Sequence, residues 1–308
     1  MATSGSTAFN MPFTDIAEEA WERAGRELRS GYDLQTARRS MNLMTIEWQN
    51  RGINMWTIEQ GVLDLVQGQA TYALPDDTID LLEQSVRTGA HNSVTQSDLN
   101  LNRISISTYA SIPNKITQSR PIQVVIHRDS GQTYPTGITL GATATSTATT
   151  ITLSGVAGLP PAGFVKIENE IINYGYIEGN VLQNCFRGQQ GTTAATHTVG
   201  GTAIPVYWEQ VPAVTVWPVP DNVESYQIVY WRMRRVQDAG SGIETADMNF
   251  RFFPCLVAGL AYHIAMKVPE FMDRVPMLKA AYEEQFELAA GEDREKAPVR
   301  FVPRAGRF

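Results

Sequence analysis

Residues 136–206 read TGITLGATATSTATTITLSGVAGLPPAGFVKIENEIINYGYIEGNVLQNCFRGQQGTTAATHTVGGTAIPV, and their composition differs from that of the rest of the chain. Five of these 71 residues are charged, about 7%, against 52 of the other 237, about 22%. Threonine and glycine contribute 13 and 11 residues to the segment. Low charge, many threonines and glycines between short apolar runs favour short β-strands over helices. The segment is therefore predicted to fold as an all-β domain.

A β-hairpin within this segment is marked by its turn. A Glu-Gly-Asn sequence at 178–180 lies between two runs of strand-forming residues, 171–177 and 181–187, and Gly and Asn are typical of tight turns. The runs 123–127 and 213–216, which flank the whole segment, also have strand character. We therefore expect the all-β domain to be inserted into a loop between two adjacent strands of a host domain.

The host domain shows weaker strand signals on its N-terminal side. Short apolar stretches at 58–66 and 70–74, around Gln67 and Gly68, predict a second hairpin. The stretch 81–86 fits either a strand or a helix, because its apolar residues follow neither period consistently.

Helices are predicted at both ends of the chain. Apolar residues recur every fourth position over 16–28 and line one face of residues 33–52. The short break at 30–31 between them predicts an antiparallel helical hairpin, the unit from which helical bundles are built. Near the C-terminus, the four-residue spacing of apolar residues over 256–268 predicts a third helix, with small residues for close packing, and a last helix is predicted over 273–291.

These elements together predict an α+β fold class. It consists of an antiparallel helical bundle with a small β-sheet, carrying an inserted all-β domain. The expected organisation is a host domain in two parts, an insert and an extended tail, with boundaries at 1–135 (helical hairpin and strands), 136–206 (insert), 207–296 (strands and C-terminal helices) and 297–308 (tail).

The overall charge and the apolar stretches exclude some function classes. With 25 basic and 32 acidic residues the net charge is −7, unlike that of a general nucleic-acid binder. The stretch 254–266 is too short to span a membrane, which takes roughly 18 to 20 residues, and the N-terminal residues do not resemble a secretory signal. We expect a protein made in the cytoplasm, without membrane association, whose Cys185 and Cys255 are buried free thiols.

The sequence contains no pattern typical of an enzyme, so no catalytic residue, metal site, cofactor or enzymatic activity is predicted. Glu168 and Glu170 alternate along one predicted strand, as a glycosidase pair could, but a solvent-facing strand is the favoured interpretation. Four histidines are scattered along the chain, none at a recognised catalytic spacing from Cys, Ser or a carboxylate: His91, His127, His197 and His263.

Two groups of arginines are candidates for binding. Arg232, Arg234 and Arg235 follow Trp231 and could grip single-stranded nucleic acid, but pairing with carboxylates of a neighbouring strand is the favoured interpretation. The tail 297–308, APVRFVPRAGRF, combines arginines and phenylalanines without an acidic residue. Such a tail could become ordered on binding a partner, with phenylalanines in pockets and arginines on acidic rims. The alternative is a frayed terminus without function.

Several runs of the host domain, taken in order, carry a resemblance to a known family. They are QTARRSMNLMTIEWQNRGINMW (35–56), SIPNKITQSRP (111–121), VWPVPD (216–221), RMRRVQDAG (232–240) and LVAGLAYHIAMK (256–267). Together they resemble the head-to-tail adaptor family of tailed bacteriophages, also called tail accessory factors or tail tubular proteins A. Within the insert, RGQQGTTAATHTVGG (187–201) is similar to a small β-module of phage tail and virion proteins.

The resemblance implies a structural virion protein of the neck and tail, present in the host cytoplasm during assembly. It implies a homo-oligomeric ring, a dodecamer, beneath the portal protein and above the tail nozzle or tail tubular protein, with helices forming the ring wall. DNA would pass through the lumen during ejection without sequence-specific binding, which an acidic wall favours. The alternative function is a carbohydrate-binding or decoration protein of the virion, acting through the inserted β domain. The implied portal-docking residues are those of the tail: Arg300, Phe301, Arg304, Arg307 and Phe308.

Overall fold

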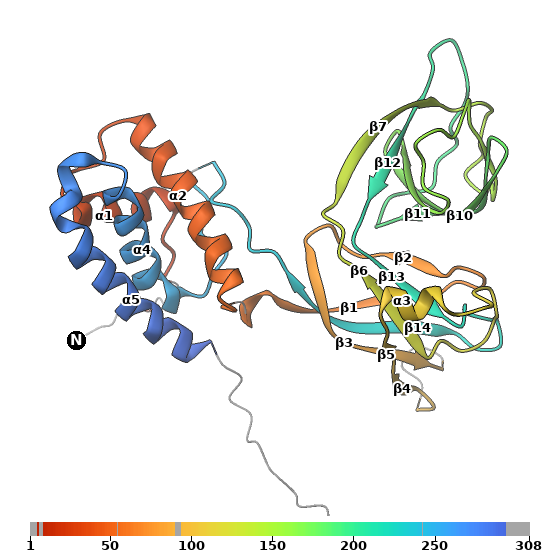
Figure 1. The fold of residues 1–308 in the computed structure, drawn as a ribbon, viewed down its shortest axis with the longest axis horizontal. Coiled ribbons are helices and arrows are strands. Elements are labelled where there is room, and N and C mark those ends of the chain that lie inside the picture. Colours follow the sequence, from red (N-terminus) through yellow and green to blue (C-terminus); the bar gives the residue numbers. More distant parts are fainter. Residues whose placement is uncertain (1–4, 6–8, 54, 90–93, 242, 294–308) are drawn as a thin grey trace, which may run out of the picture. The chain divides into compact units, whose positions relative to one another are not determined.

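The protein consists of two compact units in a computed structural model that describes residues 5, 9–53, 55–89, 94–241 and 243–293 (Figure 1). One unit is built from the two ends of the chain, Met1–Thr57 and Val236–Phe308, and the other from the central part, Ile58–Arg235. The first unit is built mainly from helices, and the second contains all the strands of the described residues.

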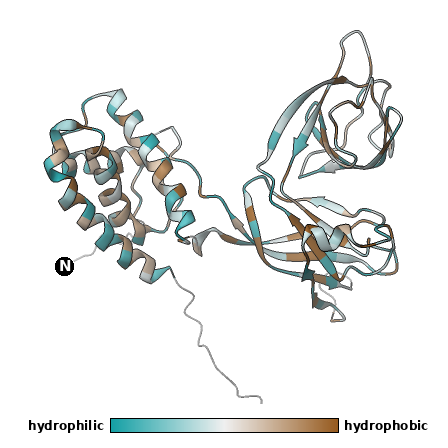
Figure 2. Ribbon diagram, in the orientation of Figure 1, coloured by the Kyte–Doolittle hydropathy of each residue, from teal (hydrophilic) through white to brown (hydrophobic). Residues whose placement is uncertain are grey.

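The helical unit is organised around one buried helix. Ten of the 13 residues of α4 (Phe253–Ala265) are buried, because this helix is apolar on nearly all sides and contacts each of the other three long helices. These are α1 (Phe13–Ala24), α2 (Gly31–Asn50) and α5 (Val275–Glu292). Hydrophobic and hydrophilic residues are interspersed along them, as expected for helices with one buried face (Figure 2).

Close packing in this unit depends on a glycine. A Cβ on Gly259 of α4 would lie 2.7 Å from Cε2 of Tyr282 and closer still to the sulfur of Met44, so α2 and α5 approach α4 only because the side chain is missing. This confirms the predicted role of small residues in the third helix. At the same place Trp48 Nε1 donates a hydrogen bond of 2.8 Å to the hydroxyl of Tyr282.

The β unit contains two four-stranded sheets that share a hydrophobic core. The first has the order β1 (Ile58–Asp64), β14 (Tyr226–Arg234), β3 (Thr78–Thr88), β4 (Ser97–Asn100), all antiparallel. The second has the order β2 (Thr71–Ala73), β13 (Ala213–Trp217), β6 (Gln123–His127), β5 (Asn102–Arg103), with β5 parallel to β6 and followed by the short helix α3 (Ile106–Ala110).

The third sheet has six strands and a hydrophobic core of its own. Its sequence lies between β6 and β13, which pair antiparallel with Ala213 opposite His127. A cluster of five buried apolar residues from both sheets holds the six-stranded sheet against the second one: Ala73, Phe164, Ile171, Val211 and Ala213. The strand order is β7 (Gln132–Thr139), β12 (Pro205–Gln210), β9 (Gly163–Ile167), β10 (Glu170–Glu178), β11 (Val181–Gln189), β8 (Ile151–Thr152), so the boundaries expected at 135/136 and 206/207 fall inside β7 and β12.

The predicted fold class, an antiparallel helical bundle with a small β-sheet, is wrong. The described residues form 14 strands in three sheets and five α-helices, with 33% of the residues in strands and 29% in helices, and no helical bundle is evident. Part of the physical reason is the stretch 81–86, whose apolar residues fit either a strand or a helix. These residues belong to strand β3, which is 11 residues long and pairs with β14 on one side and β4 on the other. The host β-structure is therefore much larger than predicted.

One predicted hairpin is confirmed and the other is wrong. β10 and β11 pair around the predicted turn, with Glu178 opposite Val181. β1 and β2, in contrast, belong to different sheets, because the chain bends between them and the hydroxyl of Tyr72 bonds the backbone of Val66 and Gln69. Both cysteines are buried and free, as predicted.

Candidate functional site

The residues predicted to dock on the portal cannot be placed in the fold. Arg300, Phe301, Arg304, Arg307 and Phe308 all lie outside the described residues, which end at 293.

The arginines at the end of β14 are paired with carboxylates. Nη2 of Arg232 lies 2.9 Å from Oε2 of Glu59, and Nε of Arg234 lies 2.7 Å from Oε1 of the same glutamate on the neighbouring strand β1. Arg232 also forms an ion pair with Asp77. The favoured interpretation is therefore confirmed for Arg232 and Arg234, whereas Arg235 donates to the backbone carbonyls of Asp76 and Ser130 at 2.6 and 3.1 Å.

The insert contains a buried ionic network that the sequence reasoning missed. Glu170, at the start of β10, is 1% exposed, and its carboxylate accepts hydrogen bonds from Nε and Nη2 of Arg187 at 2.8 and 2.7 Å. The backbone N–H groups of Gly188 and Ala195 donate to the same carboxylate, each at 3.0 Å. Four donors thus surround one buried carboxylate, which is the arrangement a buried charge needs.

His197 lies between two carboxylates. Its Nδ1 is 2.6 Å from Oε2 of Glu168 and its Nε2 is 2.9 Å from Oε2 of Glu170. Each ring nitrogen thus lies within hydrogen-bond distance of a different glutamate. The histidine side chain is 1% exposed and connects the exposed Glu168 to the buried Glu170.

The favoured interpretation of both glutamates as solvent-facing is wrong for Glu170. Burial by itself would raise the pKa of its carboxyl group, but hydrogen bonds from Arg187, from the Ala195 and Gly188 amides and from His197 lower the pKa to about 2. A glycosidase acid needs a raised pKa and access to substrate. Glu170 has neither, since its pKa is lowered and its side chain is buried. The bonds of Glu170 and Arg187 to the backbone of Ala195 instead tie the loop around Ala195 to strands β10 and β11.

The lowered pKa of Glu170 makes the stability of the β unit sensitive to acid. Since the folded-state pKa, about 2, lies below the reference value of 4.5, the contribution of this carboxylate is complete above pH 4.5 and is lost as pH falls toward 2. Urea unfolding measured between pH 6 and pH 2 should show this loss for the wild type and not for Glu170→Gln. A difference between the two proteins that does not change with pH would contradict the assignment.

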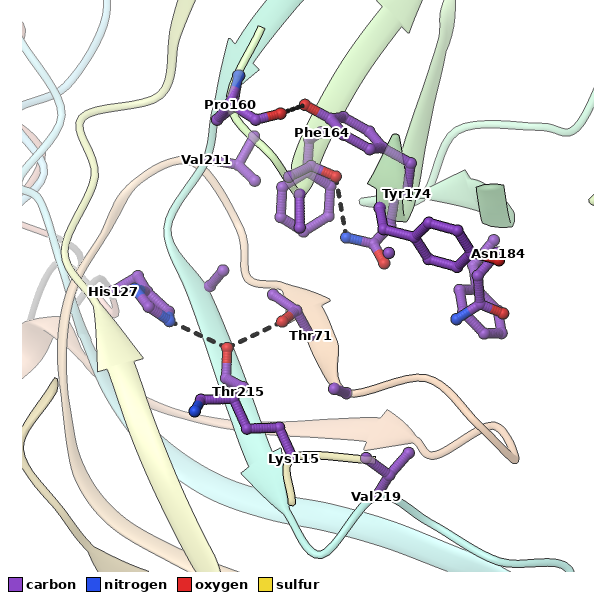
Figure 3. A pocket seen from close by; sticks show the side chains of 18 of the residues that line it. Thr71, Lys115, His127, Pro160, Phe164, Tyr174, Asn184, Val211, Thr215 and Val219 are labelled. Carbon is purple, nitrogen blue, oxygen red and sulfur yellow. Dashed lines mark hydrogen bonds between the residues drawn. The ribbon is translucent and has the colours of Figure 1, made fainter. Parts of the chain in front are cut away.

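A cavity of about 760 Å³ lies between the six-stranded sheet and the second sheet (Figure 3). Its floor is a chain of hydrogen bonds in which Thr215 Oγ1 lies 3.0 Å from Nε2 of His127 and 2.9 Å from Oγ1 of Thr71. On the opposite wall Tyr174 donates from its hydroxyl to the carbonyl of Pro160 at 2.7 Å. The lining comes from segments more than 140 residues apart, so no local motif marks it in the sequence.

Other kinds of site were sought in the same part of the chain. Among the described residues, no group of three or more His, Cys, Asp or Glu side chains is arranged to hold a metal ion. None of the described helices combines the length and the apolar composition needed to cross a bilayer.

Comparisons with known proteins found no family model that matches the chain and no curated protein with a significant sequence match.

Proposed function

We propose that the chain is a head-to-tail adaptor, a structural virion protein without enzymatic activity that joins the portal to the tail nozzle. Copies of the chain form a ring, a dodecamer by family resemblance, and DNA passes through its lumen. The net charge of −7 supports this role, because a negatively charged wall does not hold phosphates.

The observation that carries the proposal is the apolar outer face of two helices. Leu43 and Ile46 of α2 are 65% and 55% exposed, and Met277 and Leu288 of α5 are 62% and 61% exposed. In α2, Leu43 and Ile46 share one face with the exposed Tyr32. Tyr32 and Leu43 are 11 positions apart, which is about three full turns of a helix and places both on the same side. One protomer thus leaves large apolar side chains uncovered on both helices.

Two different apolar faces suit a ring better than a two-fold dimer. A two-fold dimer uses one patch that is complementary to itself, whereas every interface of a ring joins one patch to a different patch on the next copy. The faces of α2 and α5 provide such a pair within the helical unit, and the family resemblance assigns the ring wall to the helices.

The proposal is tested by electron microscopy of the full chain mixed with its own portal protein. We expect a ring added to the tail-side face of the portal. Deleting 297–308 should abolish portal binding and leave the circular dichroism spectrum and melting temperature unchanged, since this segment follows the last described helix. Unchanged co-sedimentation of the truncated protein with the portal would contradict docking by the tail, and the absence of any complex with the full chain would contradict the adaptor function.

A further inference from the structure

We infer that the cavity between the six-stranded sheet and the second sheet binds a neutral saccharide. This function goes beyond the adaptor role and does not depend on it. It also places carbohydrate binding in a site that the insert alone does not contain, because the second sheet and the residues around α3 supply part of the lining, including Thr71, Lys115 and Thr215.

The cavity is large enough and sufficiently fixed to hold a small ligand. Its volume of about 760 Å³ falls within the range of small-molecule sites, roughly 300–1,000 Å³. Phe164 belongs to the buried cluster that joins the two sheets, and Asn173 donates from Nδ2 to the carbonyl of Gly163 at 3.1 Å. The walls are therefore held in place in the absence of a ligand, which limits the entropy lost on binding.

An unpaired amide lies in this cavity through an unusual backbone arrangement. Asn184 of β11 has a φ of +53°, a left-handed conformation that asparagine adopts more readily than most other non-glycine residues. Its side chain lies across Gly175 of β10, where an added Cβ would be 3.0 Å from the Asn184 Nδ2 atom. No hydrogen bond joins the exposed side chain of Asn184 to another described residue, so its donor and acceptor are both available (Figure 3).

Aromatic rings lie in the same lining as this amide. Tyr176, two residues from Tyr174 on β10, is 53% exposed, and Phe186 and Trp208 are half-buried. Trp208 is held by stacking on Tyr134 with a centroid distance of 5.0 Å. An aromatic ring packs against the C–H face of a sugar while an amide bonds its hydroxyl groups, so this combination fits a polyhydroxylated ligand.

The charges around the cavity favour a neutral ligand. Apart from tyrosines, the lining contains four residues with ionisable side chains, Lys115, His127, Asp129 and Glu209. The ammonium group of Lys115 donates to two backbone carbonyls at 3.1 and 3.0 Å, and Glu209 accepts from the hydroxyl of Thr133 at 2.9 and 2.8 Å. Burial lowers the pKa of His127, which favours its neutral form. With His127 neutral, one ammonium and two carboxylates leave a net charge of −1 in the lining, which disfavours an anionic sugar.

Calorimetric titration of the full chain with maltohexaose, cellohexaose and chitohexaose tests this inference. We expect at least one of these saccharides to bind. Asn184→Gly should weaken that binding by about tenfold, as the loss of one or two hydrogen bonds would, and should leave the fold intact because glycine accepts the positive φ. Tyr176→Ala should weaken binding similarly. Gln183→Ala, on the same strand as Asn184 but outside the cavity lining, should not change binding.

Three results would overturn the inference: no binding of any of the three saccharides, binding that Asn184→Gly and Tyr176→Ala leave unchanged, or binding confined to sulfated or sialylated analogues. Asn184→Gly should still add a ring to the portal in electron microscopy, so failure of the saccharide site and failure of the adaptor function are separate outcomes.

Discussion

Arg187→Met is expected to lower the free energy of unfolding of the β unit by roughly 3–5 kcal/mol, the loss typical of removing one partner of a buried ion pair. The guanidinium group is only 7% exposed and provides two of the hydrogen bonds to the Glu170 carboxylate. It also donates from Nη2 to the carbonyl of Ala195 at 2.7 Å. Methionine fills much of the same volume, but it removes two of the donors to the buried carboxylate and the donor to the carbonyls of Thr145 and Ala195.

Urea unfolding followed by circular dichroism measures this loss, and Arg103→Met is the matched control in the same unit. The Arg103 side chain is 39% exposed and shares Asp80 with Arg128, so its removal should lower the free energy of unfolding by no more than about 1 kcal/mol. The double variant Glu170→Gln with Arg187→Met should be less destabilised than Arg187→Met alone, because the uncompensated charge is gone. Equal losses for Arg187→Met and Arg103→Met would show that the network does not stabilise the fold.

Some of the fold could be predicted because local patterns determine it. The turn after β10 is fixed by its Gly-Asn sequence, and the four-residue spacing over α4 is strong enough to identify a helix without tertiary information. The pairing of β1 with β14 joins residues about 170 positions apart. No local period contains that information, so the two host sheets were predicted as one small sheet and a local hairpin.

The ionic network could be predicted only in part, for a similar reason. The alternation of Glu168 and Glu170 predicted one shared strand face, but Glu168 lies in the turn between β9 and β10 and only Glu170 is in a strand. Glu170 is covered by Arg187 of the adjacent strand β11 and by His197 of the loop that follows it, 17 and 27 positions away in sequence. A usable signal was present, since isolated charges in a nearly uncharged β segment need partners when they are buried.

The saccharide cavity left no comparable signal in the sequence. Its amide depends on a left-handed φ at Asn184 and on the missing side chain of Gly175 across the strand pair. Both features arise from the register of β10 and β11, and asparagine and glycine have many other uses in turns and bulges.

Leu43→Asp and Leu288→Asp are each expected to prevent the ring from assembling on the portal while leaving the isolated chain folded. Both side chains are mostly exposed in the protomer, at 65% and 61%, so a charge there is solvated and should change the melting temperature little. In a ring that buries these faces, each leucine contributes about 1.5–3 kcal/mol per interface. Since about 1.4 kcal/mol corresponds to a tenfold change in affinity, each substitution should weaken every interface by about tenfold or more.

Lys279→Asp is the control for these two variants, because it also introduces an aspartate at an exposed position of α5. Nine residues separate it from Leu288, about two and a half helical turns, so it points away from the apolar face. Electron microscopy and analytical ultracentrifugation of each variant with the portal should show rings for the wild type and Lys279→Asp and none for the two leucine variants. If the leucine variants assemble as well as the wild type, the ring interface lies elsewhere. If Leu43→Asp alone fails, the α2 face meets a partner surface other than α5.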